Sequence, residues 1–415
     1  MSVPRFVLLF LLSIVTVVNG QPVDCTTLDG KVMAGYQGWY NTPDDGSERG
    51  FTHWARHANK PLADGNINVD VWPDLTELTP AERVKTDLRF ADGRVAEVFS
   101  SAQRETVVRH FRWMHEYGID GAFVQRFVTQ LKSPRDRRNV NLVLENCRAG
   151  ARENGRAYAV MYDLSGLGLH DTAFIVDDWK SLRTESHVTE DPAYLKHRGK
   201  PVVVIWGVGF NDGRKYTLDD CALLIDAFKQ DGCTVMVGVP TYFRSLDRDA
   251  VPDPKLLDVI ARADVVSPWT VGRYDSPEAA TRYANDTLRG DVAWCRERKL
   301  DYLPVVFPGF SWHNLRDGKA PLDQIPRLGG TFFWTQFANL HHAGLRSAYV
   351  AMFDEMDEGT AIFKCGAAPL AAVSRFVKTN DVPSDHYLRL AGEGGRLLHG
   401  ERTDSTQPAT QPALR

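Results

Sequence analysis

The sequence lacks the patterns that mark the commonest metal and nucleophile sites. Its six cysteines form no C-x-x-C pair and have no His-rich spacing beside them, which argues against a zinc centre. There is no H-E-x-x-H motif, and no serine stands in a nucleophile elbow at a predicted strand end. The even number of cysteines permits disulfides, with Cys221 and Cys233 as one local pair, or buried free thiols, and both readings stay open. We therefore expect neither a metal nor a cofactor.

The chain also lacks a basic excess and, beyond its first residues, any long apolar run. Its formal net charge is −4, which disfavours a nucleic-acid partner. The apolar run Phe6–Val18 follows Arg5 and precedes small residues at positions 18 and 20, which indicates a signal peptide over 1–20. An N-terminal anchor is the alternative, but the run is short for a bilayer. We expect a secreted or periplasmic monomer without stable membrane insertion.

Short apolar, β-branched runs alternate with longer helical patterns along the chain. Eight such runs predict buried parallel strands and hence an α/β fold, a (β/α)8 TIM barrel over residues 21–393. A doubly wound open sheet is the alternative, but residues 39–43 after the first strand form no Gly-rich phosphate loop. Residues 41–101 indicate a long loop insertion after strand one, 370–377 a last helix, and 394–415 a disordered tail. The predicted strands cover residues 32–40, 121–127, 157–164, 201–207, 234–242, 265–269, 302–307 and 348–353.

In such a barrel the active site lies at the carboxyl ends of the strands. The residues predicted there are mostly aromatic, and sugar-binding clefts use aromatic rings as platforms for pyranose rings. Carboxylates are concentrated at the ends of strands three and eight, and a carboxylate pair against aromatic walls suits the cleavage of a glycosidic bond. The candidate substrate-binding residues are Tyr36, Trp39, Tyr40, Tyr162, Trp206, Tyr242, Trp269, Trp312 and His313.

The run DEMDEG at positions 354–359 is the sharpest signal in the sequence. Four carboxylates within five residues follow directly on an apolar strand, and like charges this close raise at least one pKa, as a general acid requires. A solvated acidic turn or a calcium-binding loop has the same pattern. Asp163 ends strand three, where an isolated aspartate is as readily a helix cap or a structural acceptor.

Four segments together resemble the endo-α-1,2-mannosidase and endomannanase glycoside hydrolases of family 99 and the related family 71-like barrels, whose bacterial relatives are often labelled xylosidase or arabinosidase. They are MAGYQGWYNTP, YGIDGAFVQRF, AYAVMYDLSG and AYVAMFDEMDEGTAIF, within residues 32–363. The resemblance implies that Glu358 is the general acid/base and that Glu355 contacts the sugar at the cleavage site. It implies that Asp163, where the family usually has glutamate, deprotonates the sugar 2-hydroxyl, with net retention. Met356 and Asp357 replace a Trp and a His of the family.

Three functions remain open at this point. The first is an exported glycoside hydrolase that acts on an oligo- or polysaccharide with Glu358, Glu355 and Asp163 as catalytic residues. The second is a non-catalytic carbohydrate-binding barrel, suggested by the altered strand-eight motif and the short Asp163. The third is a barrel stabilised by calcium bound to the acidic run.

Overall fold

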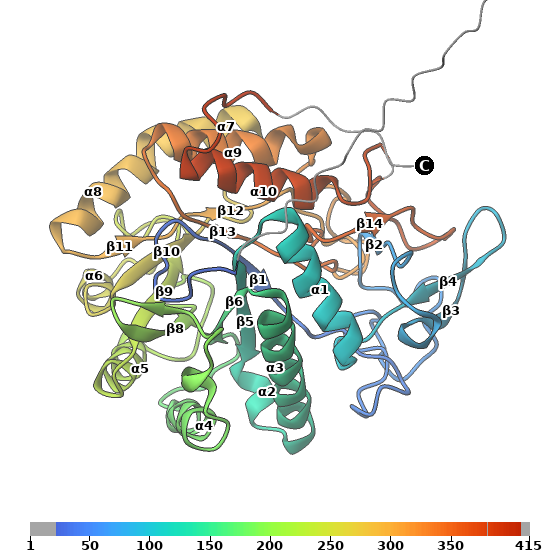
Figure 1. Cartoon of the computed structure of the whole chain (residues 1–415), viewed down its shortest axis with the longest axis horizontal. Helices are drawn as coiled ribbons and strands as arrows, with labels where there is room; N and C mark the ends of the chain where they lie inside the picture. Colours follow the sequence, from blue (N-terminus) through green and yellow to red (C-terminus); the bar gives the residue numbers. More distant parts are fainter. Residues whose placement is uncertain (1–21, 380, 408–415) are drawn as a thin grey trace, which may run out of the picture.

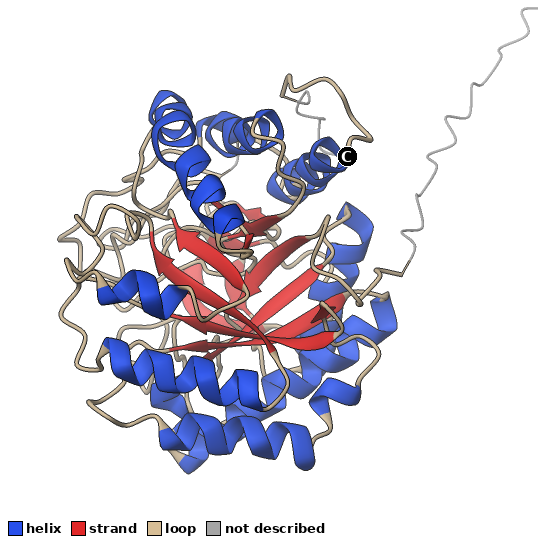
Figure 2. Cartoon of the chain, turned by 90° about the vertical axis from the view of Figure 1, so that its left-hand side faces the viewer, coloured by secondary structure: helices blue, strands red, loops and turns tan. Residues whose placement is uncertain are grey.

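The computed structural model describes residues 22–379 and 381–407 and has a curved parallel sheet at its centre (Figures 1 and 2). Most strand residues are fully buried, as expected for strands covered on both faces. The strands are β1 (Val32–Tyr36), β5 (Gly121–Phe127), β6 (Ala157–Asp163), β8 (Lys200–Trp206), β9 (Thr234–Pro240), β10 (Val265–Trp269), β11 (Asp301–Tyr302), β12 (Val305–Val306) and β13 (Ala348–Val350).

The sheet closes through β11 and β12, which are two halves of one interrupted strand. β11 pairs with β10, while β12 pairs with β13, and β13 pairs in parallel with β1. Between the halves, the Leu303 amide donates to the Val266 carbonyl at 2.9 Å, and the Pro304 carbonyl accepts from the Tyr349 amide at 2.8 Å. Each strand of the ring is therefore hydrogen-bonded to the strands on both sides of it. The predicted (β/α)8 TIM barrel is confirmed.

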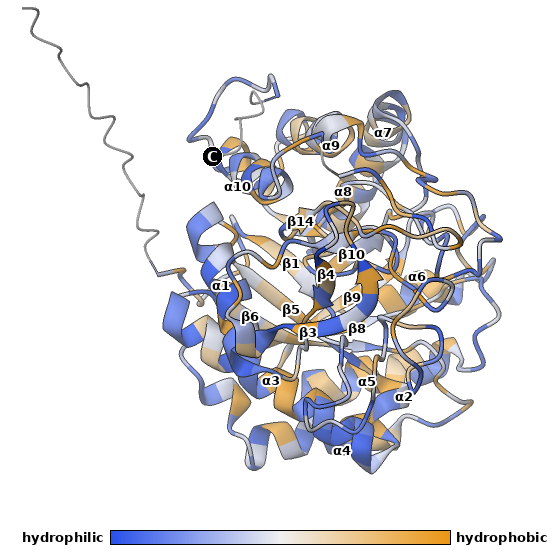
Figure 3. Cartoon of the chain, turned by 90° about the vertical axis from the view of Figure 1, so that its right-hand side faces the viewer, coloured by the Kyte–Doolittle hydropathy of each residue, from blue (hydrophilic) through white to orange (hydrophobic). Residues whose placement is uncertain are grey.

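Helices surround the barrel and connect its strands (Figure 1). Local capping fixes several of their ends: Thr217 and Asp220 form a reciprocal capping box at the start of one helix, and Gly155 ends another in the left-handed conformation. Figure 3 shows hydrophobic strand segments inside and hydrophilic residues on the outer faces of the helices. The helices are α1 (Arg104–Tyr117), α2 (Val128–Leu131), α3 (Pro134–Asn154), α4 (Ala173–Thr184), α5 (Leu218–Gln230), α6 (Lys255–Ile260), α7 (Pro277–Tyr283), α8 (Arg289–Glu297), α9 (Thr331–His342) and α10 (His386–His399).

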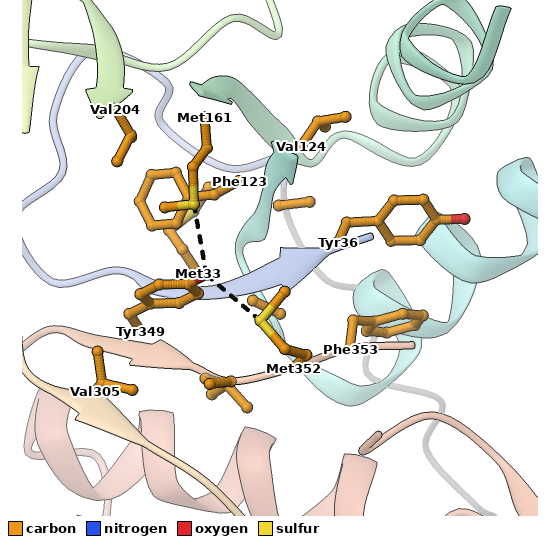
Figure 4. Packing of buried hydrophobic residues seen from close by; sticks show 14 of the residues in the cluster. Met33, Tyr36, Phe123, Val124, Met161, Val204, Val305, Tyr349, Met352 and Phe353 are labelled. Atoms are coloured by element: carbon orange, nitrogen blue, oxygen red, sulfur yellow. Dashed lines mark hydrogen bonds between the residues drawn. The ribbon is translucent and has the colours of Figure 1, made fainter. Parts of the chain in front are cut away.

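The barrel interior is filled by large apolar side chains around Tyr349 of β13 (Figure 4). The Tyr349 hydroxyl lies 3.6 Å from the sulfur of Met161 and 3.5 Å from that of Met352. Gly35 leaves space for this cluster, because a Cβ there would lie 2.2 Å from Cε of Met352. This packed layer forms the floor beneath the strand ends.

The predicted insertion after strand one is a folded segment with short strands of its own. It contains β2 (Trp72–Pro73), which pairs with β14 (Cys365–Gly366), and a hairpin of β3 (Val84–Arg89) and β4 (Val95–Val98). Asp70 attaches it to the loop after β12, since its carboxylate accepts from the Ser311 hydroxyl at 2.5 Å and from the amides of His313 and Asn314. The Asp70 amide donates to the Met356 carbonyl at 3.0 Å, so the insertion also holds the loop after β13.

The predicted helix over 370–377 is wrong, because this segment runs without regular structure along the insertion. The Leu370 amide donates to Arg89, and the Val377 amide donates to Asp70. Leu370 and Val373 are 63% and 70% exposed.

The last helix, α10, continues through position 394, where the sequence indicated the start of a disordered tail. Its glycines allow close packing: a Cβ on Gly392 would lie 1.8 Å from the Tyr117 carbonyl oxygen, and one on Gly394 would lie 2.6 Å from the Phe337 ring. The tail prediction therefore began too early, and its positions 408–415 lie outside the described residues. The predicted signal peptide, 1–20, lies outside them as well.

The six cysteines are free thiols, five of them buried and Cys25 half-buried, so the local pairing of Cys221 with Cys233 is not formed. No helix in the described part of the chain is long and apolar enough to cross a membrane.

Candidate functional site

Three carboxyl groups converge at the carboxyl ends of the barrel strands. Asp163 is the last residue of β6, and Glu355 and Glu358 lie in the loop after β13, on the opposite side of β1 and β5. The negative charge of Asp163 raises the pKa of Glu358, and the negative charges of Glu355 and Asp163 both raise the pKa of the Tyr349 hydroxyl. The predicted catalytic residues therefore share one site above the Tyr349 floor.

Glu355 is held on both of its oxygens. Gln37, directly after β1, donates from its side-chain amide to Oε1 at 2.6 Å, and the Thr360 hydroxyl donates to Oε2 at 2.8 Å. The side chain is almost fully buried. Burial, and then the negative charges of Glu358 and Asp357, raise the pKa of the Glu355 carboxyl well above its ordinary value. Glu355 is thus the fixed member of the three.

Glu358 is the least constrained member. It is partly exposed, and its carboxyl makes no hydrogen bond with any residue that the structure describes, although its backbone carbonyl accepts from the Ser311 amide at 2.9 Å. Burial, followed by the charges of Asp357 and Asp163, raises the pKa of this carboxyl from 4.5 to about 8. This raised pKa favours the protonated form of Glu358 near neutral pH.

Among the described residues, the Asp163 carboxylate accepts hydrogen bonds only from its own loop. The Ser165 amide donates to its Oδ1 at 2.7 Å. Burial raises the pKa of this carboxyl, the hydrogen bonds from Ser165 and the charge of Arg214 lower it, and Asp212 raises it again. Asp163 is therefore the one of the three with a cation nearby.

The other two acids of DEMDEG point away from the site and fix the loop to the segment after β1. The Asp354 carboxylate accepts from the amides of Gln37 and Gly38 at 2.8 and 2.9 Å. Gly38 has φ of +57°, a conformation that glycine adopts without strain. Burial raises the pKa of the Asp354 carboxyl to about 7. Asp354 thereby joins the first strand of the barrel to the loop after the last one.

Asp357 is held by the segment after β1 and by the insertion. Its Oδ1 accepts from the Tyr40 hydroxyl at 2.9 Å, and its Oδ2 lies 2.9 Å from Nδ1 of His53. The same Tyr40 oxygen accepts from the Met356 amide at 2.8 Å. Tyr40 is fully buried, so the prediction that it contacts substrate is wrong, and its hydroxyl instead shapes the loop that carries Glu355 and Glu358.

The acidic run does not form a cation cage, because its four carboxylates divide between two directions. In the described ranges, no group of three or more His, Cys, Asp or Glu side chains is arranged to hold a metal ion. The calcium-stabilised alternative therefore has no candidate site in that part of the chain.

Partly exposed aromatic rings border the three carboxyl groups. Trp206 ends β8 and is the register partner of Asp163, and its ring meets the Trp269 ring edge-on with centroids 5.3 Å apart. Trp269 in turn lies 6.0 Å from the Tyr349 ring. On the side of β1, Trp39 stacks on His53 with ring centroids 3.8 Å apart. The rings of Trp39, Trp206 and Trp269 thus lie at the same strand ends as the carboxyl groups, and their role in substrate binding stays a prediction.

Two predicted substrate-binding tyrosines point out of the barrel instead, and their prediction is wrong. The Tyr36 hydroxyl lies 2.8 Å from Nδ1 of His110 on α1, and Figure 4 shows its ring directed away from the interior. The Tyr162 hydroxyl donates to Asp178 on α4 at 2.7 Å. Successive side chains of a strand face opposite sides, so Asp163 faces the site only if Tyr162 faces the helices.

Three further candidates lie in loops above the strands and have no hydrogen bond to the three carboxyl groups. The Tyr242 ring is covered by the Arg248 guanidinium at 4.2 Å, and the Trp312 ring by that of Arg316 at 4.9 Å. His313 Nδ1 binds the Ala320 carbonyl at 2.7 Å. A role for Tyr242, Trp312 or His313 in binding stays a prediction.

Sequence reasoning missed Gln37, Thr360 and Arg214. Gln37 and Thr360 lie inside the two motifs that indicated the site. Their polar side chains, next to the aromatic and acidic residues of these motifs, were the signal that could have identified them. Arg214 lies eight positions past the end of β8 in a loop, and nothing in the sequence pattern placed it next to Asp163.

The architecture is similar to that of glycoside hydrolases of known structure. Two structures of the GH99 endo-alpha-mannosidase from Bacteroides thetaiotaomicron superpose with TM-scores of 0.64, at 15% and 14% identity, over 91% of this chain and 99% of theirs. A glycoside hydrolase-like protein superposes with a TM-score of 0.52 at 13% identity, over 81% of this chain and 97% of its own. No family model and no curated protein sequence matches the chain. At these identities the likeness establishes the barrel fold.

Proposed function

We propose that this protein is a glycoside hydrolase that cleaves an oligo- or polysaccharide by carboxylate acid/base catalysis with retention. The observation that carries the proposal is that Asp163 and Glu358 lie together at the strand ends beside partly exposed Trp rings, with the carboxyl of Glu358 free of hydrogen bonds from the described residues and raised in pKa. The resemblance of the sequence motifs to family 99 and the superposition on an endo-α-mannosidase support the same reaction class.

Glu358 acts as the general acid. With a pKa of about 8, the carboxyl is protonated in roughly ten molecules for each ionised one at pH 7. Departure of a sugar alkoxide requires a proton on the glycosidic oxygen, and a neutral carboxylic acid free of protein hydrogen bonds can supply it. Activity should accordingly fall as the pH rises through about 8.

Asp163 acts as the base and Glu355 contacts the sugar. In the proposed first step Asp163 takes the proton of the sugar 2-hydroxyl, O2 bonds to the anomeric carbon, and the glycosidic bond breaks as Glu358 protonates the leaving oxygen. Water then opens the 1,2-anhydro sugar, giving its proton to Glu358 while Asp163 returns a proton to O2. Glu355, fixed by Gln37 and Thr360, offers little freedom for proton transfer and suits substrate orientation.

The N-terminal apolar run supports export, so we propose a secreted or periplasmic location and a carbohydrate outside the cytoplasm as the partner. A mass spectrum of the exported protein that starts at Gln21 tests this location. Detection of the uncleaved chain in the cytoplasm would contradict it.

The activity is tested with a panel of α- and β-linked oligosaccharides, headed by α-linked mannosides. Products are separated by chromatography, and the first anomer released is identified by proton NMR; retention is the expected result. Glu358→Gln should abolish hydrolysis, while Glu297→Gln, an exposed control on α8, should leave it unchanged. Measurable glycan affinity without any product at several pH values would instead establish the non-catalytic carbohydrate-binding barrel.

A further inference from the structure

An arginine is caged beside the site in the loop that joins β8 to α5. The guanidinium of Arg214 lies 5.1 Å from the centroid of the Trp206 ring, 5.0 Å from that of Phe210 and 5.7 Å from that of Tyr216. It also donates to the Tyr216 hydroxyl at 2.7 Å, and the side chain is only 11% exposed. The guanidinium is therefore in cation–π contact with the surrounding rings.

The Arg214 guanidinium is also paired with Asp212. The Arg214 Nε donates to Oδ1 of Asp212 at 2.9 Å, and Nη2 donates to Oδ2 at 2.9 Å. This paired geometry uses two donors of the guanidinium, while the aromatic rings cover its faces. Asp212 thus takes up two donors of the Arg214 guanidinium, and the positive charge lies close to the groups around it.

The cage lies against the backbone at the end of β6. Trp206 pairs in register with Asp163, and its carbonyl accepts from the Leu164 amide at 3.0 Å. A Cβ on Gly207 would lie 2.7 Å from Nη1 of Arg214 and 3.2 Å from the Leu164 Cβ. The absence of a side chain at Gly207 thus lets the guanidinium approach the point where the chain leaves Asp163.

We propose that Arg214 is a positioning residue that keeps Asp163 ionised, so that Asp163 can serve as the base while Glu358 carries the proton. The inference deepens the proposed function and rests on it. Two buried carboxyls in one site would otherwise both tend to be neutral, and a reaction that needs an acid and a base requires a difference between them.

The charged groups around the two carboxyls supply that difference. Asp163 faces Arg214, Asp212 and Tyr216 from the loop after β8, Ser165 from its own loop, and Tyr349 and Glu358 from β13 and its loop. Of these, only Arg214 is a cation. The charges that act on Glu358 are both negative. Burial raises the pKa of both carboxyls, but at Asp163 the charge of Arg214 opposes this rise, whereas at Glu358 the neighbouring charges add to it.

The experiment follows the ionisation of Asp163 directly, in the full chain labelled with carbon-13 at aspartate carboxyls and assigned with Asp163→Asn. Arg214→Met keeps an apolar stem in the cage but removes the charge, and should raise the titration midpoint of Asp163 by about one pH unit. Asp212→Asn removes a negative charge that faces Asp163, and should lower the midpoint. Arg248→Met, an arginine stacked on Tyr242, is the matched control and should leave it unchanged.

An unchanged Asp163 midpoint in Arg214→Met would overturn the proposal, as would an equal rise in Arg214→Lys, which retains the charge. If Arg214→Met does not fold, Asp212→Asn decides alone, and a midpoint that does not fall refutes the assignment. If the parent is active, the pH profile of kcat/KM for Arg214→Met should show its acidic limb shifted by the same amount as the Asp163 midpoint. The limb near pH 8, which reports Glu358, should stay where it is in the parent. The NMR titration needs no substrate, so a failure of the proposed function, seen as no hydrolysis of any glycan by the parent, is distinguishable from a failure of the Arg214 assignment.

Discussion

Replacement of Glu358 by glutamine should abolish turnover and also stabilise the protein at neutral pH. The carboxyl of Glu358 has a pKa of about 8 in the folded chain and an ordinary value of 4.5 when exposed. Between these two values the folded state binds a proton that the unfolded state has lost. Stability therefore falls as the pH rises through this window, and the loss is complete above about pH 8.

The size of the effect follows from the separation of the two pKa values. One pKa unit corresponds to about 1.4 kcal/mol, so the native acid costs about 3 kcal/mol at pH 7 and close to 5 kcal/mol above pH 8. These are upper values, because the side chain is partly exposed. Glutamine has nearly the same shape, stays neutral at every pH and avoids the cost. For a chain of this length, a gain of about 3 kcal/mol raises Tm by roughly 4 °C.

The assay is thermal unfolding of the parent, Glu358→Gln and the exposed control Glu297→Gln at pH 4, 7 and 8.5. We expect equal Tm values for the parent and Glu358→Gln at pH 4, and a difference that grows toward alkaline pH. The Glu297→Gln control should follow the parent throughout. A Glu358→Gln variant no more stable than the parent at pH 8.5 would refute the raised pKa and, with it, the assignment of Glu358 as the acid.

Three further substitutions test the geometry of the site. Gly238→Ala should raise KM and cost roughly 1–3 kcal/mol, because the new Cβ would lie 2.4 Å from Cδ1 of Trp206 and displace that ring; substrate titration and denaturant unfolding measure both effects, and an unchanged KM would contradict the role of Trp206. Tyr40→Phe should cost roughly 2–3 kcal/mol and lower kcat, since it removes the hydroxyl bound to Asp357; a fully active variant would show that this contact is dispensable. Tyr36→Phe should leave KM unchanged and cost about 1 kcal/mol, whereas a raised KM would place Tyr36 in the site.

The barrel could be predicted from the sequence because its strands are buried on both faces and appear as apolar runs between helical patterns. The seventh strand was recognisable despite the interruption at Leu303 and Pro304, since the run around it remains apolar. The end of the chain was misread for a definite reason. Gly392 and Gly394 look like flexible positions, but in α10 they allow the helix to approach Tyr117 and Phe337 closely, and only the tertiary packing reveals this.

The site was predictable in part. An acidic run after an apolar strand indicates a functional loop, and the strand-end rule places Asp163 near it. The sequence pattern could not show that Tyr36 and Tyr162 face the helices. A strand buried on both faces has no alternation of polar and apolar residues, so the sequence does not show which side chains point into the barrel. Arg214 was out of reach for another reason, since its contact with Trp206 depends on a loop path that no local pattern encodes.

The two aspartates and the two glutamates of DEMDEG have different roles. The aspartates connect the acidic run to the YQGWY motif, which is far from it in sequence. Asp354 binds the amides after β1, and Asp357 binds Tyr40 of the same segment, so YQGWY and the acidic run form one structural unit across the seam where the first and last strands meet. Glu355 and Glu358, each one position further along, are thereby turned to the other side, into the site. The buried charge of Asp357 has a second effect, because it raises the pKa of Glu358. A residue whose contacts are structural thus helps to keep the proton on the acid, and a chain that lost Asp357 would lose both functions together.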